Sequence, residues 1–206
     1  QAPSTVIVID EAYIRFSDQS IVELCQEMKN LVIIRSLSKD FGLAGIRVGY
    51  IVGTAKLNQF VTSVKSPYNV NQIALLAAKV SFEDEKYFRI TRNKIVANRK
   101  RLKTQLEQLG LQVISSEANF LLVNFGNKSN YIFSRLRNEK VLVRNFPGNK
   151  RLIDYLRITI GTKEQMELLI RKLRRFLGEY TAWNNEQENP SLKSNMRKKM
   201  ASSWRQ

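Results

Sequence analysis

Short apolar runs separated by polar and turn-forming residues make up the first part of the chain. Residues 6–9, 31–35 and 47–52 have the pattern of strands, and residues 20–28 and 54–65 have the pattern of helices. Fully apolar strands that alternate with helices are typical of a parallel sheet with right-handed crossovers. We therefore expect an α/β fold in this part of the chain.

A long basic helix follows a predicted helix at residues 70–82. Residues 86–110 contain eight Lys or Arg residues and one acid, and apolar residues recur in steps of seven at Phe88, Ile95 and Leu102. This spacing puts the apolar side chains on one face of a helix and most of the charges on the solvated face.

The pattern changes after this helix. Residues 120–125, 141–144 and 155–160 are predicted strands, and residues 130–138 and 163–177 are predicted helices. We expect them to form a small α+β layer, with helices on one face of a mostly antiparallel sheet.

These changes of pattern predict two domains and a tail. The boundary is expected inside the long helix, so that residues 1–90 form one domain and residues 91–180 form a second, smaller one. Residues 181–206 are polar, with five Lys or Arg residues and two Glu, and we expect them to be disordered.

Composition narrows the chemistry that the chain can perform. It has no histidine and a single cysteine, Cys25, which excludes an internal disulfide, argues against the usual zinc sites and fits a reducing, cytoplasmic compartment. No run approaches the roughly 20 apolar residues of a membrane-spanning helix. The net charge is +16, but the basic residues are spread over helices, so we favour a solvated surface over nucleic-acid binding.

Two groups of polar residues follow the first two predicted strands. Asp10 and Tyr13 come after the strand at residues 6–9, and the sequence Ser-Leu-Ser-Lys at residues 36–39 comes after the strand at residues 31–35. Ligands of open parallel sheets bind where the carboxyl ends of the strands meet. We expect both groups to face the same crevice.

The residue types in these groups match the needs of pyridoxal phosphate. Lys39 can bond to the aldehyde of the cofactor, and its place after a buried strand is expected to make the amine more nucleophilic by partial burial. Asp10 can keep the pyridine nitrogen protonated, while Ser36, Ser38 and Arg47 can bind the phosphate. Singly, each has an ordinary explanation, such as a surface lysine or a helix cap, so the assignment depends on their combination.

The segments Val-Ile-Asp-Glu-Ala-Tyr and Ser-Leu-Ser-Lys-Asp-Phe-Gly-Leu-Ala-Gly-Ile-Arg-Val-Gly-Tyr closely resemble the fold-type I pyridoxal phosphate-dependent aminotransferases, and within them the histidinol-phosphate aminotransferases. The resemblance extends from about residue 6 to residue 180. It implies a C-terminal portion of such an enzyme that lacks the N-terminal part: an incomplete, mostly parallel sheet of the large cofactor-binding domain, followed by the small α+β domain.

The resemblance also implies roles for individual residues. Lys39 bonds to the cofactor and moves the proton of the substrate's α-carbon, Asp10 pairs with the pyridine nitrogen, and Tyr13 hydrogen-bonds the phenolic oxygen. The residues that hold the cofactor phosphate are Ser36, Ser38 and Arg47.

Two arginines in the second domain resemble substrate-binding residues of the family. Arg157, in Tyr-Leu-Arg-Ile-Thr-Ile-Gly, matches the arginine that binds the carboxylate of amino- and keto-acid substrates, and Arg144, in Val-Leu-Val-Arg, matches a position that binds the substrate phosphate. The alternative for both is a surface ion pair.

The implied reaction is transamination between L-histidinol phosphate and 2-oxoglutarate in histidine biosynthesis, by a homodimer when the protein is complete. A related decarboxylase, a broad-range aminotransferase and a non-catalytic remnant of the fold stay open as alternatives. Because the ring-stacking wall of the family's site is not found in these residues, we expect the chain alone to be a poor or inactive catalyst.

Overall fold

The structure is a computed structural model and describes residues 5–188, which form two compact units. The first takes in the chain up to Arg101 together with Ser115–Leu121, and the second takes in Leu102–Ile114 and the chain from Leu122 onward. The division falls inside the long basic helix α4, Glu85–Gln108, after Arg101, whereas the sequence predicts a boundary in the same helix near residue 90.

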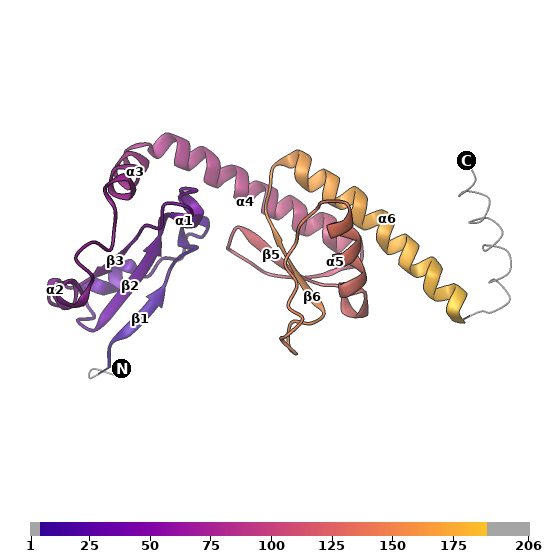
Figure 1. Ribbon diagram of the computed structural model, residues 1–206, viewed down its shortest axis with the longest axis horizontal. Helices are drawn as coiled ribbons and strands as arrows, with labels where there is room; N and C mark the ends of the chain where they lie inside the picture. The colour runs from indigo at the N-terminus through magenta and orange to yellow at the C-terminus, as the bar shows by residue number, and fades with distance from the viewer. Residues whose placement is uncertain (1–4, 189–206) are drawn as a thin grey trace. The chain divides into compact units, whose positions relative to one another are not determined.

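A three-stranded sheet in the order β1-β2-β3 organises the first unit. Its strands are β1 (Ile7–Asp10), β2 (Leu31–Ser36) and β3 (Gly49–Gly53). Strands β1 and β2 are parallel, with Asp10 opposite Ile34, whereas β2 and β3 are antiparallel (Figure 1).

The expectation of a parallel third strand was wrong. The connection from β2 to β3 contains one short helix, α1 (Leu37–Asp40), which rises only about 6 Å. A parallel crossover must return along the whole six-residue strand β2, about 20 Å. The chain instead turns directly back and pairs antiparallel.

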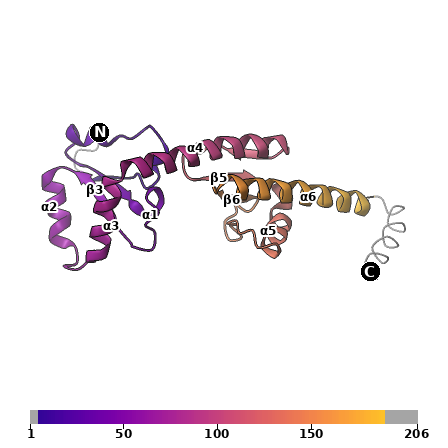
Figure 2. The same cartoon turned by 90° about the horizontal axis from the view of Figure 1, so that it is seen from above.

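The helices of the first unit are short before α4. Within the predicted helix at residues 20–28, only residues 22–26 are helical, as a 3₁₀ helix whose Val22 and Cys25 face the core at a spacing of three residues. Figure 2 shows α2 and α3, which follow the sheet. The remaining bounds are η1 (Ile14–Phe16), η2 (Val22–Gln26), α2 (Ala55–Val64) and α3 (Gln72–Glu83).

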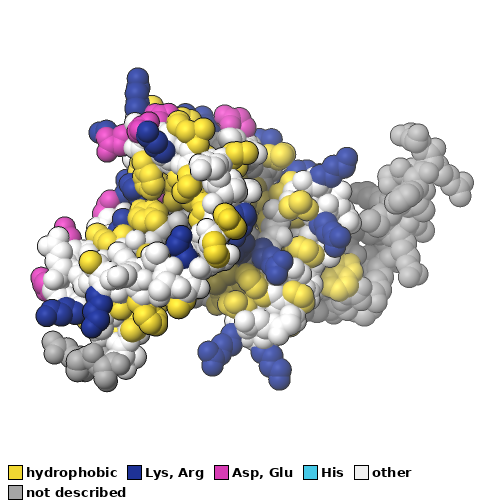
Figure 3. Space-filling model, turned by 60° about the vertical axis from the view of Figure 1, so that its left-hand side comes forward, with side chains coloured by type: hydrophobic (Ala, Val, Ile, Leu, Met, Phe, Trp, Pro, Cys, Tyr) yellow, Lys and Arg dark blue, Asp and Glu magenta, His cyan; other side chains and the backbone are white. Residues whose placement is uncertain are grey.

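The first unit has a well-packed side and an open side. Leu31 and Ile33 pack with Cys25 of η2 on one face of the sheet. On the other face Val8 is 54% exposed and Ile34 is 40% exposed. Hydrophobic side chains are also visible among the charged ones on the face drawn in Figure 3. Separately, the hydrophobic side chains of helices α2 and α3 that are more than 60% exposed are Phe60, Val64, Ile73 and Leu76.

The second unit combines a three-stranded sheet, in the order β4-β5-β6, with helices α5 and α6. Strands β4 and β5 pair antiparallel, and β4 was not expected from the sequence. Buried Leu156 and Ile158 of β6 alternate with less buried residues, so one face of the strand belongs to the core. The bounds are β4 (Gln112–Ile114), β5 (Phe120–Asn124), η3 (Gly126–Lys128), α5 (Ser129–Asn138), β6 (Tyr155–Thr159) and α6 (Lys163–Glu188).

Two expectations for the second unit need correction. The predicted strand at residues 141–144 pairs only at Arg144, because the Val141 amide is bonded to the Leu136 carbonyl of α5 at 2.9 Å instead of to a neighbouring strand. Residues 181–188 of the predicted tail belong to α6, where the ring of Tyr180 contacts Tyr131 and Trp183 at 5.2 and 5.9 Å. Residues 189–206 of that tail lie outside the described residues.

Among the residues that the structure describes, no helix is both long enough and apolar enough to cross a membrane.

Candidate functional site

The candidate residues of the first unit lie where strands β1 and β2 end. Because these strands are parallel and Asp10 pairs in register with Ile34, the segments after Asp10 and after Ser36 leave the sheet at the same edge. Open α/β sheets bind ligands at this edge. The cavity beside Asp10 and Tyr13 is not lined by Ser36, Ser38, Lys39 or Arg47, so the expectation that both groups face one crevice stays a prediction.

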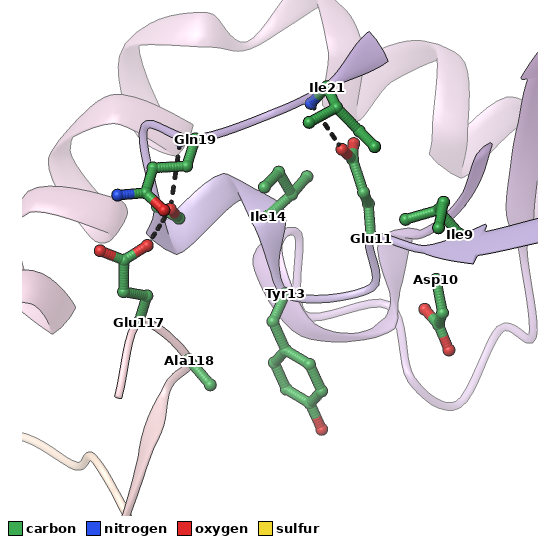
Figure 4. A pocket seen from close by; sticks show the side chains of 10 residues that line it. Ile9, Asp10, Glu11, Tyr13, Ile14, Gln19, Ile21, Glu117 and Ala118 are labelled. Carbon is green, nitrogen blue, oxygen red and sulfur yellow. Dashed lines mark hydrogen bonds between the residues drawn. The ribbon is translucent and has the colours of Figure 1, made fainter. Parts of the chain in front are cut away.

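Asp10 and Tyr13 line one cavity of about 390 Å³. Figure 4 shows both side chains projecting to the same side of the loop that follows β1. The Asp10 Oδ1 atom accepts a hydrogen bond of 2.9 Å from the Ala12 amide, and the Tyr13 ring packs edge-on against Phe120 with 5.4 Å between centroids. These contacts hold the two side chains in place while the carboxylate remains exposed.

Lys39 stands on the short helix α1 with the two candidate serines beside it. Ser36 is the N-cap, and its Oγ accepts a hydrogen bond of 3.1 Å from the Ser38 amide. Leu37 is 1% exposed and anchors the helix in the core, so Lys39, two positions later, points the other way. Its side chain is exposed, and the partial burial expected from the sequence is not found.

Arg47 has an unusual backbone conformation just before β3. Its φ is +62°, in the left-handed region that long side chains rarely adopt, and its Nη1 donates to the Ala44 carbonyl at 3.0 Å. Gly42, with φ +71°, makes the turn that brings the chain back. Backbone strain of this kind is concentrated at ligand-binding loops.

A buried ion pair behind the site was missed in the sequence. Glu11 is 7% exposed and accepts hydrogen bonds from Arg35 Nε and Nη2 at 3.0 and 2.8 Å, and from the Ile21 amide at 3.0 Å. The pair joins the segment after β1 to the end of β2, and therefore fixes Asp10 relative to Ser36. The sequence feature that could have indicated this ion pair is the charged residue at the end of each apolar strand, Glu11 after β1 and Arg35 in β2.

A second buried acid follows Lys39. Burial raises the pKa of the Asp40 carboxyl, and the Phe41 amide, at 3.0 Å from Oδ1, and Arg15, at 3.9 Å from Oδ2, oppose the shift. The carboxyl is therefore a weaker ionic partner for Arg15 than an exposed aspartate would be.

The two arginines of the second unit lie opposite each other on neighbouring segments. The Arg144 amide donates to the Arg157 carbonyl at 3.0 Å, and the Arg157 amide donates to the Arg144 carbonyl at 2.8 Å. Residues paired in this way project their side chains to the same face, here the face of β6 opposite Leu156 and Ile158. Two arginines on one face are suited to a substrate with two anionic groups.

The residues of the first unit fit pyridoxal phosphate in their chemistry. The carboxylate of Asp10 and the phenol of Tyr13 line one cavity. At the same edge of the sheet, Lys39 comes directly after the hydroxyl groups of two serines, and Arg47, with its strained backbone, ends the loop. The cofactor requires these groups: an amine, an anion for the ring nitrogen, and donors for the phosphate.

Comparison with protein families agrees with this chemistry. The model of the family "Aminotransferase class I and II" matches residues 1–173. The histidinol-phosphate aminotransferase 1 of Carboxydothermus hydrogenoformans is 43% identical over 172 residues, which are 84% of this chain and 49% of that protein. The chain therefore spans about half the length of the curated relatives that it matches.

Solved structures share the fold. The histidinol-phosphate aminotransferase of Sinorhizobium meliloti, solved in complex with pyridoxal-5'-phosphate, has a TM-score of 0.77 at 27% identity, over 86% of this chain and 50% of that one. L-threonine-O-3-phosphate decarboxylase of Porphyromonas gingivalis has a TM-score of 0.75 at 28% identity, over 86% of this chain and 56% of that one.

Proposed function

Because the chain belongs to the class I and II aminotransferase family, we propose that it forms the lysine-bearing part of a pyridoxal phosphate enzyme that transfers the amino group of L-histidinol phosphate to 2-oxoglutarate. The proposal depends above all on the parallel pairing of β1 with β2, which brings Asp10 and the segment Ser36–Lys39 to one edge of the sheet. When bound, the cofactor supplies an electron sink that stabilises negative charge on the substrate's α-carbon.

The residues of the first unit have separate tasks in this proposal. Asp10 holds a proton on the ring nitrogen by charge, and Tyr13 donates a hydrogen bond from its hydroxyl to the phenolic oxygen. The Lys39 amine moves the proton between the α-carbon of the substrate and the cofactor. The donors to the cofactor phosphate are Ser36, Ser38 and Arg47.

In the second unit, Arg157 binds the carboxylate of 2-oxoglutarate and glutamate, and Arg144 binds the phosphate of histidinol phosphate. Their paired backbones support this division, because the two substrates of a transaminase use one site in turn. Histidinol phosphate has a phosphate and no carboxylate, whereas 2-oxoglutarate has carboxylates alone. Two adjacent cations allow one site to accept both.

The proposal extends to the assembly and the compartment of the complete protein. Members of this family generally act as homodimers on small-molecule substrates, and the single cysteine of the chain fits a reducing compartment. We therefore propose a cytoplasmic homodimer.

The substrate assignment is tested with Arg144→Ala in the protein expressed from its complete gene. The ratio of kcat/KM for histidinol phosphate to kcat/KM for a non-phosphorylated amino acid is expected to fall about 10- to 100-fold, because a charge-assisted bond to the phosphate is lost. Arg137→Ala is the matched control, since Arg137 is an exposed arginine on α5. An unchanged ratio in Arg144→Ala would remove the substrate assignment and leave the cofactor assignment standing.

Decarboxylation is the second candidate reaction, because the L-threonine-O-3-phosphate decarboxylase of P. gingivalis is as similar in fold and sequence as the solved aminotransferase of S. meliloti. Product analysis separates the two. A transaminase consumes 2-oxoglutarate and releases glutamate, whereas a decarboxylase releases carbon dioxide from an amino-acid substrate without any keto acid.

A further inference from the structure

A second cavity in the first unit is surrounded by arginines. It has a volume of about 360 Å³, and Arg15, Arg35 and Arg92 line it together with a single acid, Asp18. None of the proposed cofactor-binding residues is part of its wall. The wall therefore has an excess of positive charge that the proposed reaction does not use.

Arg15 is fixed in the wall without a full ionic partner. Its guanidinium lies 4.9 Å from the centroid of the Phe88 ring and 5.5 Å from that of Phe41. Its guanidinium donates no hydrogen bond to any residue within 5–188, and its buried Nε atom forms only a long ion pair, 3.9 Å from Asp40 Oδ2. The aromatic rings thus orient a cation whose donors are available to a ligand.

The other two arginines are held more firmly. Arg35 is bound by Glu11, and Arg92 donates to the Arg15 carbonyl at 2.6 Å and to Asp18 at 2.5 Å. The side chain of Asp18 is 92% exposed, so its pairing with Arg92 is weakened by water. An anion in the cavity can therefore share Arg92 with Asp18, while Arg35 adds positive charge from a fixed position.

We propose that this cavity binds the phosphate group of a small metabolite, or inorganic phosphate, with Arg15 as the principal ligand. A guanidinium presents two parallel donors that match two oxygens of a phosphate, and a second guanidinium nearby neutralises the remaining charge. The cavity is the size of a small ligand. A single small hollow with three arginines also differs from the extended basic surface that a nucleic acid requires.

The test is calorimetric titration of inorganic phosphate into the 206-residue chain at about pH 8 and constant ionic strength. All proteins carry Arg47→Gln, so that the proposed cofactor-phosphate site is disabled and the result does not depend on the proposed reaction. Adding Arg15→Gln is expected to weaken phosphate binding about tenfold or more. Adding Arg101→Gln, an exposed residue of the same helix as Arg92, removes the same charge outside the cavity and is expected to change binding less than twofold.

Arg15→Lys separates loss of the ligand from a folding defect, because lysine keeps the positive charge but lacks the two parallel donors of arginine. The phosphate affinity of this variant is expected to lie between that of the parent and that of Arg15→Gln. Thermal unfolding of each variant is recorded alongside. Equal binding in Arg15→Gln and its parent, or equal losses in Arg15→Gln and Arg101→Gln, would overturn the proposal. Loss of all phosphate binding in the Arg47→Gln parent would do the same, because the anion site would then be the cofactor site.

Discussion

At the scale of single residues, the buried carboxyl of Asp40 makes stability depend on pH. Burial raises its pKa above the ordinary value of 3.8, so the folded protein favours the protonated acid. The stabilisation from this group is complete below the unfolded pKa and is lost as the pH rises through the folded pKa.

Asp40→Asn removes this dependence and keeps an acceptor for the Phe41 amide. The melting temperature of the variant is expected to match that of the parent below the ordinary pKa of 3.8 and to exceed it increasingly as the pH rises through the raised pKa of the folded protein. Paired thermal melts at several pH values measure the difference. A difference that does not vary with pH, or one that falls as the pH rises, would contradict the assignment.

The sequence predicts which residue types belong to the site more readily than it predicts their burial and contacts. Asp10 and Tyr13 were predicted to lie near one ligand, and the structure places both in the wall of one cavity. Glu11 with Arg35 escaped notice, because 24 residues separate them and only the folded sheet brings them together. The exposure of Lys39 was also missed, since it depends on which side of a single helical turn packs inward.

At the scale of elements, periodicity predicted most helices and strands but not every strand direction. The apolar runs at β1 and β2 and the seven-residue spacing in α4 are strong local signals. The direction of β3 depends on the length of the connection before it. The strand predicted at residues 141–144 is largely absent because the Val141 amide bonds back to the Leu136 carbonyl of α5, a contact that the apolar run does not reveal.

The close pairing of β2 with β3 depends on Gly49. A Cβ atom there would lie 2.7 Å from the Arg35 carbonyl oxygen, a backbone atom that cannot move aside. Gly49→Ala is expected to destabilise the chain by about 1–3 kcal/mol through overpacking. A urea titration measures the loss as a lower midpoint.

Gly45→Ala is the control for that loss. A Cβ at Gly45 meets no atom within 4 Å, so this change is expected to stay within about 0.5 kcal/mol. Equal midpoints for the two variants would refute the steric explanation.

At the scale of the whole molecule, the chain provides one wall of a binding site and a sheet with an exposed apolar face. Its sheet leaves Val8 and Ile34 exposed on one face, and it spans about half the length of its curated relatives. The weak activity expected of the chain alone follows from these facts and stays a prediction. The family is established by residues 1–173, whereas the reaction depends on the protein that contains them.

The most direct test of the central claim is the position at which pyridoxal phosphate bonds to the protein expressed from its complete gene. The protein is saturated with cofactor, reduced with borohydride, digested and examined by mass spectrometry, with Lys39→Ala and the exposed-lysine variant Lys56→Ala in parallel. We predict about one cofactor per chain on the Lys39 peptide, unchanged in Lys56→Ala and absent in Lys39→Ala. Labelling that spreads over several lysines, or that persists in Lys39→Ala, would contradict the account.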